Sequence, residues 1–219
     1  MDYLNEQRLT ETDLETNPAN RVAICLCIDT SFSMVEQNRI KHVNDSVRKF
    51  IEDSKEDEYA VDAIDLCIVT FGGKAEIVQP FANVSKIVYR DLVPNGDTPL
   101  GEAVRLSMEA IAERRNQYSA HGITSYKPWL IIMSDGVATD NTTSVSANVR
   151  NAIKERTVKV KCIDMSSDKK NSLAGFTLDG EVSVLTDFQI DNFFEMLSRS
   201  AAGLSTAVPG LDDDIDLNF

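Results

Sequence analysis

Apolar runs of strand length alternate along this chain with segments in which apolar residues recur every three or four positions. The run 22–28 is unbroken and rich in β-branched residues, a pattern typical of a strand buried on both faces of a parallel sheet. Three- and four-residue spacing indicates amphipathic helices. We therefore predict strands at 22–28, 65–71, 75–81, 129–134, 158–165 and 182–185, and helices over 40–51, 98–118, 145–153, 173–176 and 191–204.

Strands that alternate with helices predict an α/β fold, a doubly wound and mostly parallel central sheet with helices on both faces, as in Rossmann-like proteins. The glycine pair 72–73 separates two strand-like runs, so these should form a hairpin that adds one antiparallel edge strand. The acidic cluster 52–58 should end the preceding helix in a surface loop, and 84–93 should form one helical turn and a loop. We expect one domain over 21–205, a polar leader over 1–20 and a disordered acidic tail over 206–219.

Composition narrows the classes of partner. The 219 residues carry a net charge of -13 with a pI near 4.6, which argues against nucleic acid or an anionic membrane as partner. The leader lacks a basic region followed by an apolar core, and no apolar run reaches the length of a membrane span, so we expect a cytoplasmic protein. The four cysteines fall inside strand-like runs without zinc-ligand spacing, as expected for buried thiols.

Three oxygen-bearing side chains follow the first strand, because the run 22–28 leads directly into Asp29, Ser31 and Ser33. In open α/β sheets ligands bind beyond the carboxyl ends of the strands. Oxygen ligands without imidazole or thiolate suit a hard cation, so Mg²⁺ is the expected ion, with Mn²⁺ or Ca²⁺ as alternatives. A serine or aspartate in this position can also be an ordinary helix cap.

Two further segments add to this group. Thr98 stands just before the longest predicted helix, where its hydroxyl could either cap that helix or face a metal, and Asp135 ends the strand 129–134. The order D-x-S-x-S, then T, then D resembles the metal-ion-dependent adhesion site (MIDAS) of von Willebrand factor A (VWA) domains. That resemblance implies a VWA fold and a divalent ion held by these five residues.

The resemblance extends over about 17–205. In detail the chain is similar to bacterial VWA proteins of the tellurite-resistance type, often called TerY-like or YegL-like. The matching segments are 17–21, 29–34, 96–103, 113–118, 121–123, 126–129 and 134–140. These relatives imply a cytoplasmic protein in a chemical-stress system, with a protein kinase or a PP2C-type phosphatase as partner. Two positions depart from the family, Phe32 in place of glycine and Asp97 in place of glycine or asparagine. Phe32 is strained if the site needs a positive φ there, and otherwise projects beside the ion as an apolar contact; Asp97 could tighten ion binding or be a ligand.

The expected function is binding of a partner's Asp or Glu side chain through the metal, without catalysis. A phosphohydrolase of the haloacid-dehalogenase kind would need a second acid two positions after Asp29, and Ser31 cannot act as one at neutral pH. A metal-free scaffold, in which the three hydroxyls only cap helices, is the other alternative. The aspartates of the tail could also reach the metal of a neighbouring copy, and this would produce self-association.

Overall fold

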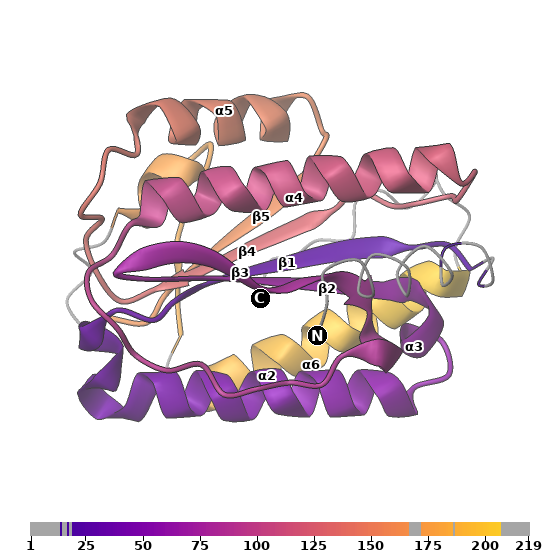
Figure 1. Cartoon of the computed structure of the whole chain (residues 1–219), viewed down its shortest axis with the longest axis horizontal. Coiled ribbons are helices and arrows are strands. Elements are labelled where there is room, and N and C mark those ends of the chain that lie inside the picture. Colours follow the sequence, from indigo (N-terminus) through magenta and orange to yellow (C-terminus); the bar gives the residue numbers. More distant parts are fainter. Residues whose placement is uncertain (1–13, 15–16, 18, 167–171, 186, 207–219) are drawn as a thin grey trace.

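A six-stranded sheet forms the centre of the computed structural model, which describes residues 14, 17, 19–166, 172–185 and 187–206. The strand order is β3-β2-β1-β4-β5-β6, and every neighbouring pair is parallel except β2 and β3. β3 therefore forms an antiparallel edge, which confirms the predicted hairpin (Figure 1). The strands are β1 (Val22–Asp29), β2 (Ile64–Gly72), β3 (Lys74–Asn83), β4 (Trp129–Ser134), β5 (Lys159–Asp164) and β6 (Ser183–Val184).

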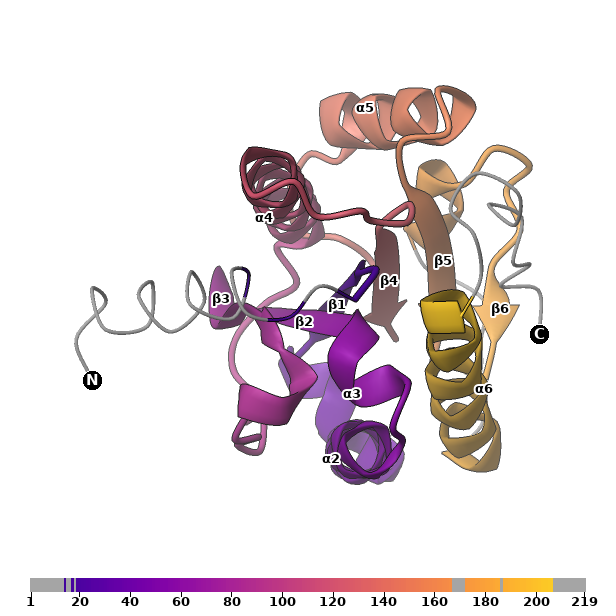
Figure 2. The same ribbon diagram turned by 90° about the vertical axis from the view of Figure 1, so that its right-hand side faces the viewer.

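Helices cover both faces of this sheet, as the alternation of strands and helices predicts. Figure 2 shows α4 and α5 on one face and α2, α3 and α6 on the other. Their bounds are α2 (Arg39–Glu56), α3 (Ala60–Ala63), α4 (Leu100–Ala120), α5 (Thr143–Lys154) and α6 (Asp187–Thr206), with 3-10 turns η1 (Phe32–Asn38), η2 (Val84–Lys86) and η3 (Leu173–Phe176). Within the described part of the chain, no helix is both long and apolar enough to span a membrane.

β1 is fully buried because it lies in the middle of the sheet and contributes to two hydrophobic layers. Side chains at its even positions, such as Ile24 and Leu26, pack in the layer under α2 and α6. Its odd positions, Cys25 and Cys27, pack in the layer under α4 and α5. An unbroken apolar run is what such a strand requires, since neither face meets water.

The structure differs from the predictions at element ends. α2 continues to Glu56, so most of the acidic cluster 52–58 is helical and the expected surface loop is wrong there. The ion pair Lys49–Asp53, one turn apart at 2.8 Å, and the buried Ser54 hydroxyl, 3.1 Å from Ser198 Oγ, explain why the helix continues. β6 has only two residues. The tail and most of the leader lie outside the described residues.

A buried polar network joins α4 to the sheet. Asp65 Oδ2 accepts hydrogen bonds from Arg114 Nη2 at 2.7 Å and from Tyr118 OH at 2.6 Å, while Asp65 Oδ1 lies 3.3 Å from Arg21 Nη1. All four side chains are almost completely buried. Two guanidinium groups and a phenol thus compensate a carboxylate that would be costly to bury alone.

Candidate metal centre

The loop after β1 brings three of the predicted site residues together. Asp29 Oδ1 accepts a hydrogen bond from the Ser31 backbone N–H at 2.7 Å, which folds the chain back immediately after the strand. Ser31 Oγ then lies 3.0 Å from Ser33 Oγ. Ser31 precedes η1 without making a side-chain capping bond, so its hydroxyl is directed to Ser33 rather than to the helix.

Asp29 is a fully buried carboxylate with limited compensation. Its Oδ2 accepts a hydrogen bond from Ser134 Oγ at 2.5 Å, a contact that the sequence analysis missed. Burial raises the pKa of Asp29 from its ordinary value of 3.8 to about 6, although the bonds from Ser134 and Ser31 act in the opposite direction. A cation placed beside this group would supply the missing compensation.

The loop that carries Thr98 is held against the end of β1 by backbone hydrogen bonds. Asn95 N–H donates to the Thr30 carbonyl at 2.6 Å, and Phe32 N–H donates to the Gly96 carbonyl at 3.1 Å. The loops approach so closely that a Cβ on Gly72 would lie 2.4 Å from the Asn95 carbonyl oxygen. Glycine is required at this contact, since any side chain would displace the loop that positions Thr98.

The structure bears on one of the two alternatives for the Thr98 hydroxyl, the capping of α4. Amides at the start of α4 are bound by a different residue, because Gly101 N–H and Glu102 N–H donate to the two Asp140 carboxylate oxygens at 2.9 and 2.8 Å. Asp140 therefore caps α4, and the alternative in which the Thr98 hydroxyl is the cap is not supported. A Cβ on Gly136 would lie 3.8 Å from Thr98 Oγ1 and equally far from Ser33 Oγ, so both hydroxyls border the same small space.

Asp135 completes the group, and it has a partner that the sequence did not reveal. Asp135 Oδ1 accepts a hydrogen bond from Ser33 Oγ at 2.7 Å. Its other oxygen, Oδ2, lies 2.6 Å from Arg39 Nη1, and this ion pair is buried, with the two side chains 0% and 7% exposed. Arg39 Nε is buried without a hydrogen-bond partner. The guanidinium thus binds one carboxylate oxygen and leaves the other directed to Ser33.

These residues fit a small, hard cation. The three hydroxyl oxygens and two carboxylates supply only oxygen, and among the described residues no group of three or more His, Cys, Asp or Glu offers an alternative site. Neighbouring ligands of an octahedral ion with bonds of about 2.1 Å lie about 3 Å apart. The Ser31–Ser33 and Ser33–Asp135 separations of 3.0 and 2.7 Å are of that size.

The structure also gives the conformation and exposure of the two residues that depart from the family pattern, Phe32 and Asp97. Phe32 is not among the residues with positive φ, so the condition under which it would be strained is not met. Its side chain is 64% exposed and projects from the loop between the two serines. Asp97 is exposed, and its carbonyl oxygen accepts a hydrogen bond from Gly73 N–H at 2.8 Å.

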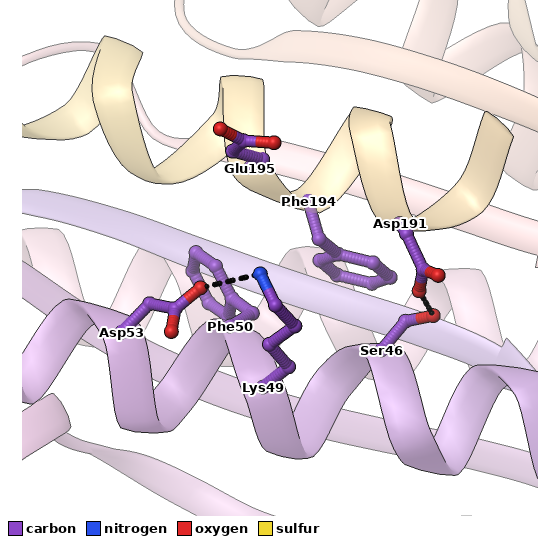
Figure 3. A pocket seen from close by; sticks show the side chains of 7 residues that line it. All are labelled: Ser46, Lys49, Phe50, Asp53, Asp191, Phe194 and Glu195. Carbon is purple, nitrogen blue, oxygen red and sulfur yellow. Dashed lines mark hydrogen bonds and ion pairs between the residues drawn. The ribbon is translucent and has the colours of Figure 1, made fainter. Parts of the chain in front are cut away.

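A shallow hollow, separate from the candidate metal centre, lies between α2 and α6 (Figure 3). Its charged groups have partners: Lys49 Nζ is 2.8 Å from Asp53 Oδ2, Ser46 Oγ donates to Asp191 Oδ1 at 2.5 Å, and Glu195 pairs with Arg199 outside the hollow. This hollow is a polar margin of helix packing. It is lined by Ser46, Lys49, Phe50, Asp53, Asp191, Phe194 and Glu195.

The family profile of the von Willebrand factor type A domain matches residues 23–196, which includes every residue of the candidate metal centre. The chain belongs to this family. VWA domains are commonly metal-dependent protein-interaction modules. A search of curated protein sequences finds no match.

Solved structures similar to this VWA domain include the pilus adhesin SpaC from Lactobacillus rhamnosus GG, with a TM-score of 0.64 and 12% identity over 85% of this chain and 30% of that chain. The mussel byssus proximal thread matrix protein 1, described with a zinc-occupied MIDAS motif, has a TM-score of 0.57 and 12% identity over 85% of this chain and 47% of that chain. The PilB minor pilin from Streptococcus sanguinis has a TM-score of 0.55 and 13% identity over 85% and 62%. This chain thus spans less than two thirds of each, and at such identities the likeness shows the fold alone.

Proposed function

We propose that this VWA domain binds a divalent cation, in the cell most simply Mg²⁺, and uses it to recognise a carboxylate on a protein partner. Asp29, Ser31, Ser33, Thr98 and Asp135 would hold the ion. When bound, the ion would supply an electron-poor position at which an incoming Asp or Glu oxygen can replace water. The observation that carries the proposal is that Asp140 takes over the capping of α4, which leaves Thr98 Oγ1 at the space that Ser33 Oγ also borders.

The chain's own residues prepare the site for an anionic partner. Asp29 and Asp135 carry two negative charges, and Arg39 contributes one positive charge from the same buried cluster. A divalent cation therefore brings the group to a net charge of +1. A third acidic ligand in the site would have made the net charge zero. A partner carboxylate would restore neutrality, so charge favours binding of an acidic group.

The metal-free scaffold, the main alternative, receives less support. It requires Ser31, Ser33 and Thr98 to cap helices, but η1 has no side-chain cap and α4 is capped by Asp140. No catalytic role is proposed, in keeping with the interaction role of VWA domains.

The resemblance to TerY-like proteins supports a finer proposal, that the partner is a protein kinase or a PP2C-type phosphatase of a bacterial chemical-stress system in the cytoplasm. Pull-down with purified candidates in Mg²⁺ and in EDTA tests it. Retention in both conditions would contradict a metal-dependent interaction.

Calorimetric titration with Mg²⁺ tests the site. We expect one ion per chain in the wild type, at least tenfold weaker binding in Thr98→Ala, and wild-type binding in Thr143→Ala, a matched control on the exposed start of α5. Absence of Mg²⁺ binding in the wild type, or equal binding in all three proteins, would overturn the proposal.

A further inference from the structure

Three large, exposed apolar side chains lie within two residues of candidate metal ligands in the sequence. Phe32 is 64% exposed, Val35 is 55% exposed and Val137 is 60% exposed. Phe32 lies between the two serines, Val35 follows Ser33 by two residues, and Val137 follows Asp135 by two residues. We call these three residues the apolar rim. Exposed apolar groups gathered around a binding site indicate a contact surface for an apolar partner segment.

The rim and the metal together define what a partner must offer. The loaded site would carry a net positive charge at its centre and apolar side chains at its edge. A complementary segment therefore places carboxylates next to large apolar side chains. The segment 211–219 of this same chain, Leu-Asp-Asp-Asp-Ile-Asp-Leu-Asn-Phe, has this character, with four aspartates among four large apolar residues.

We propose that the segment 211–219 of a second copy of this chain occupies the metal centre, with an aspartate at the ion and its apolar neighbours on the apolar rim. This inference rests on the proposed metal site and concerns self-association, separately from the kinase or phosphatase partner. Charge complementarity supports it, because a chain of net charge -13 presents here a site that the ion and Arg39 would make positive.

The length of the chain favours a second copy over the same molecule. α6 has 20 residues and is therefore about 30 Å long. Its yellow C-terminal end lies beside α3, at the opposite end of the strands from the start of α2 (Figure 1). Asp212 and Asp214 follow Thr206 by six and eight residues, which span at most about 20–29 Å when fully extended. Asp212, Asp213 and Asp214 are therefore too close to Thr206 to span the length of α6 back to their own site, whereas Asp216, ten residues after Thr206, could extend over at most about 33–36 Å.

Sedimentation velocity of the full chain over a concentration series tests the proposal. We expect self-association in Mg²⁺ that weakens at least tenfold in EDTA. The same loss should follow when Asp212, Asp213, Asp214 and Asp216 are all replaced by Asn. A control with the same change of charge should associate like the wild type; it replaces the exposed Glu52, Glu56, Glu58 and Glu181 by Gln.

A labelled peptide of sequence 209–219 gives a second readout. It should bind the full-length four-Asn variant in Mg²⁺ and be released by EDTA, and Phe32→Ser should weaken its binding. A monomeric wild type that binds Mg²⁺ in calorimetry would overturn the tail proposal while leaving the metal site intact. A wild type that binds no Mg²⁺ would overturn both. Peptide binding that persists in EDTA, or a monomeric wild type whose own tail excludes the peptide, would also contradict binding between copies.

Discussion

Replacing Arg39 should destabilise the metal-free protein much more than the metal-bound protein. Its guanidinium lies 2.6 Å from Asp135 Oδ2 in a pair that is almost fully buried. In Arg39→Met the carboxylate stays buried without this counter-charge. Removing one partner of a buried ion pair costs about 3–5 kcal/mol of unfolding free energy. In a domain of this size that is a fall in melting temperature of about 6–20 °C.

A divalent cation should restore much of this loss, because it would compensate Asp135 in place of the guanidinium. We therefore expect a large deficit of Arg39→Met in EDTA and a clearly smaller one in saturating Mg²⁺, both measured by urea unfolding. Lys41→Met is the matched control on the same helix. Its exposed pair with Asp45 should contribute less than about 1 kcal/mol in either condition.

Two results would refute this reasoning. A deficit of Arg39→Met below about 1 kcal/mol in EDTA would show that Asp135 does not depend on the guanidinium. An equal deficit in EDTA and in Mg²⁺ would show that the ion does not interact with Asp135.

Other predictions concern the core and the rim. Tyr118→Phe removes one donor to Asp65 and should cost about 1.5–3 kcal/mol in urea unfolding without changing Mg²⁺ affinity; a neutral effect would contradict the buried network. Phe32→Ser should change the unfolding free energy by less than about 0.5 kcal/mol, since the side chain is exposed, and a larger loss would place it in the core. Burial raises the pKa of the Cys162 thiol to about 12, so a thiol reagent at pH 8 should label the native protein only as it unfolds; labelling of folded protein within minutes would be inconsistent with the fold. The other three thiols, Cys25, Cys27 and Cys67, are also buried, and a thiol reagent should likewise reach them only in unfolded protein.

The sequence predicts the central strands well because their physical requirement is simple. β1 and β4 are buried on both faces, so each must be largely apolar. β1 ends at Asp29, and β4 ends one residue before Asp135. The hairpin of β2 and β3 follows equally directly from the glycine turn between two strand-like runs.

The sequence is less informative where a role depends on distant partners. Arg39 begins a helix and looks like any surface arginine until the fold brings Asp135 against it. Asp140 lies nearly forty positions from the amides that it caps, so local spacing favoured Thr98 instead. The extent of α2 depends on ion pairs and packing against α6, which outweigh the acidic character of its last turn.

The most direct test of the central claim is anomalous scattering from a crystal grown in Mn²⁺, which has the same preference for oxygen ligands as Mg²⁺ and scatters more strongly. We predict one strong peak per chain, bordered by the hydroxyls of Ser31, Ser33 and Thr98 and by the carboxylates of Asp29 and Asp135. A fully ordered site in abundant Mn²⁺ with no peak among these five side chains, or a peak elsewhere on the domain only, would contradict the account.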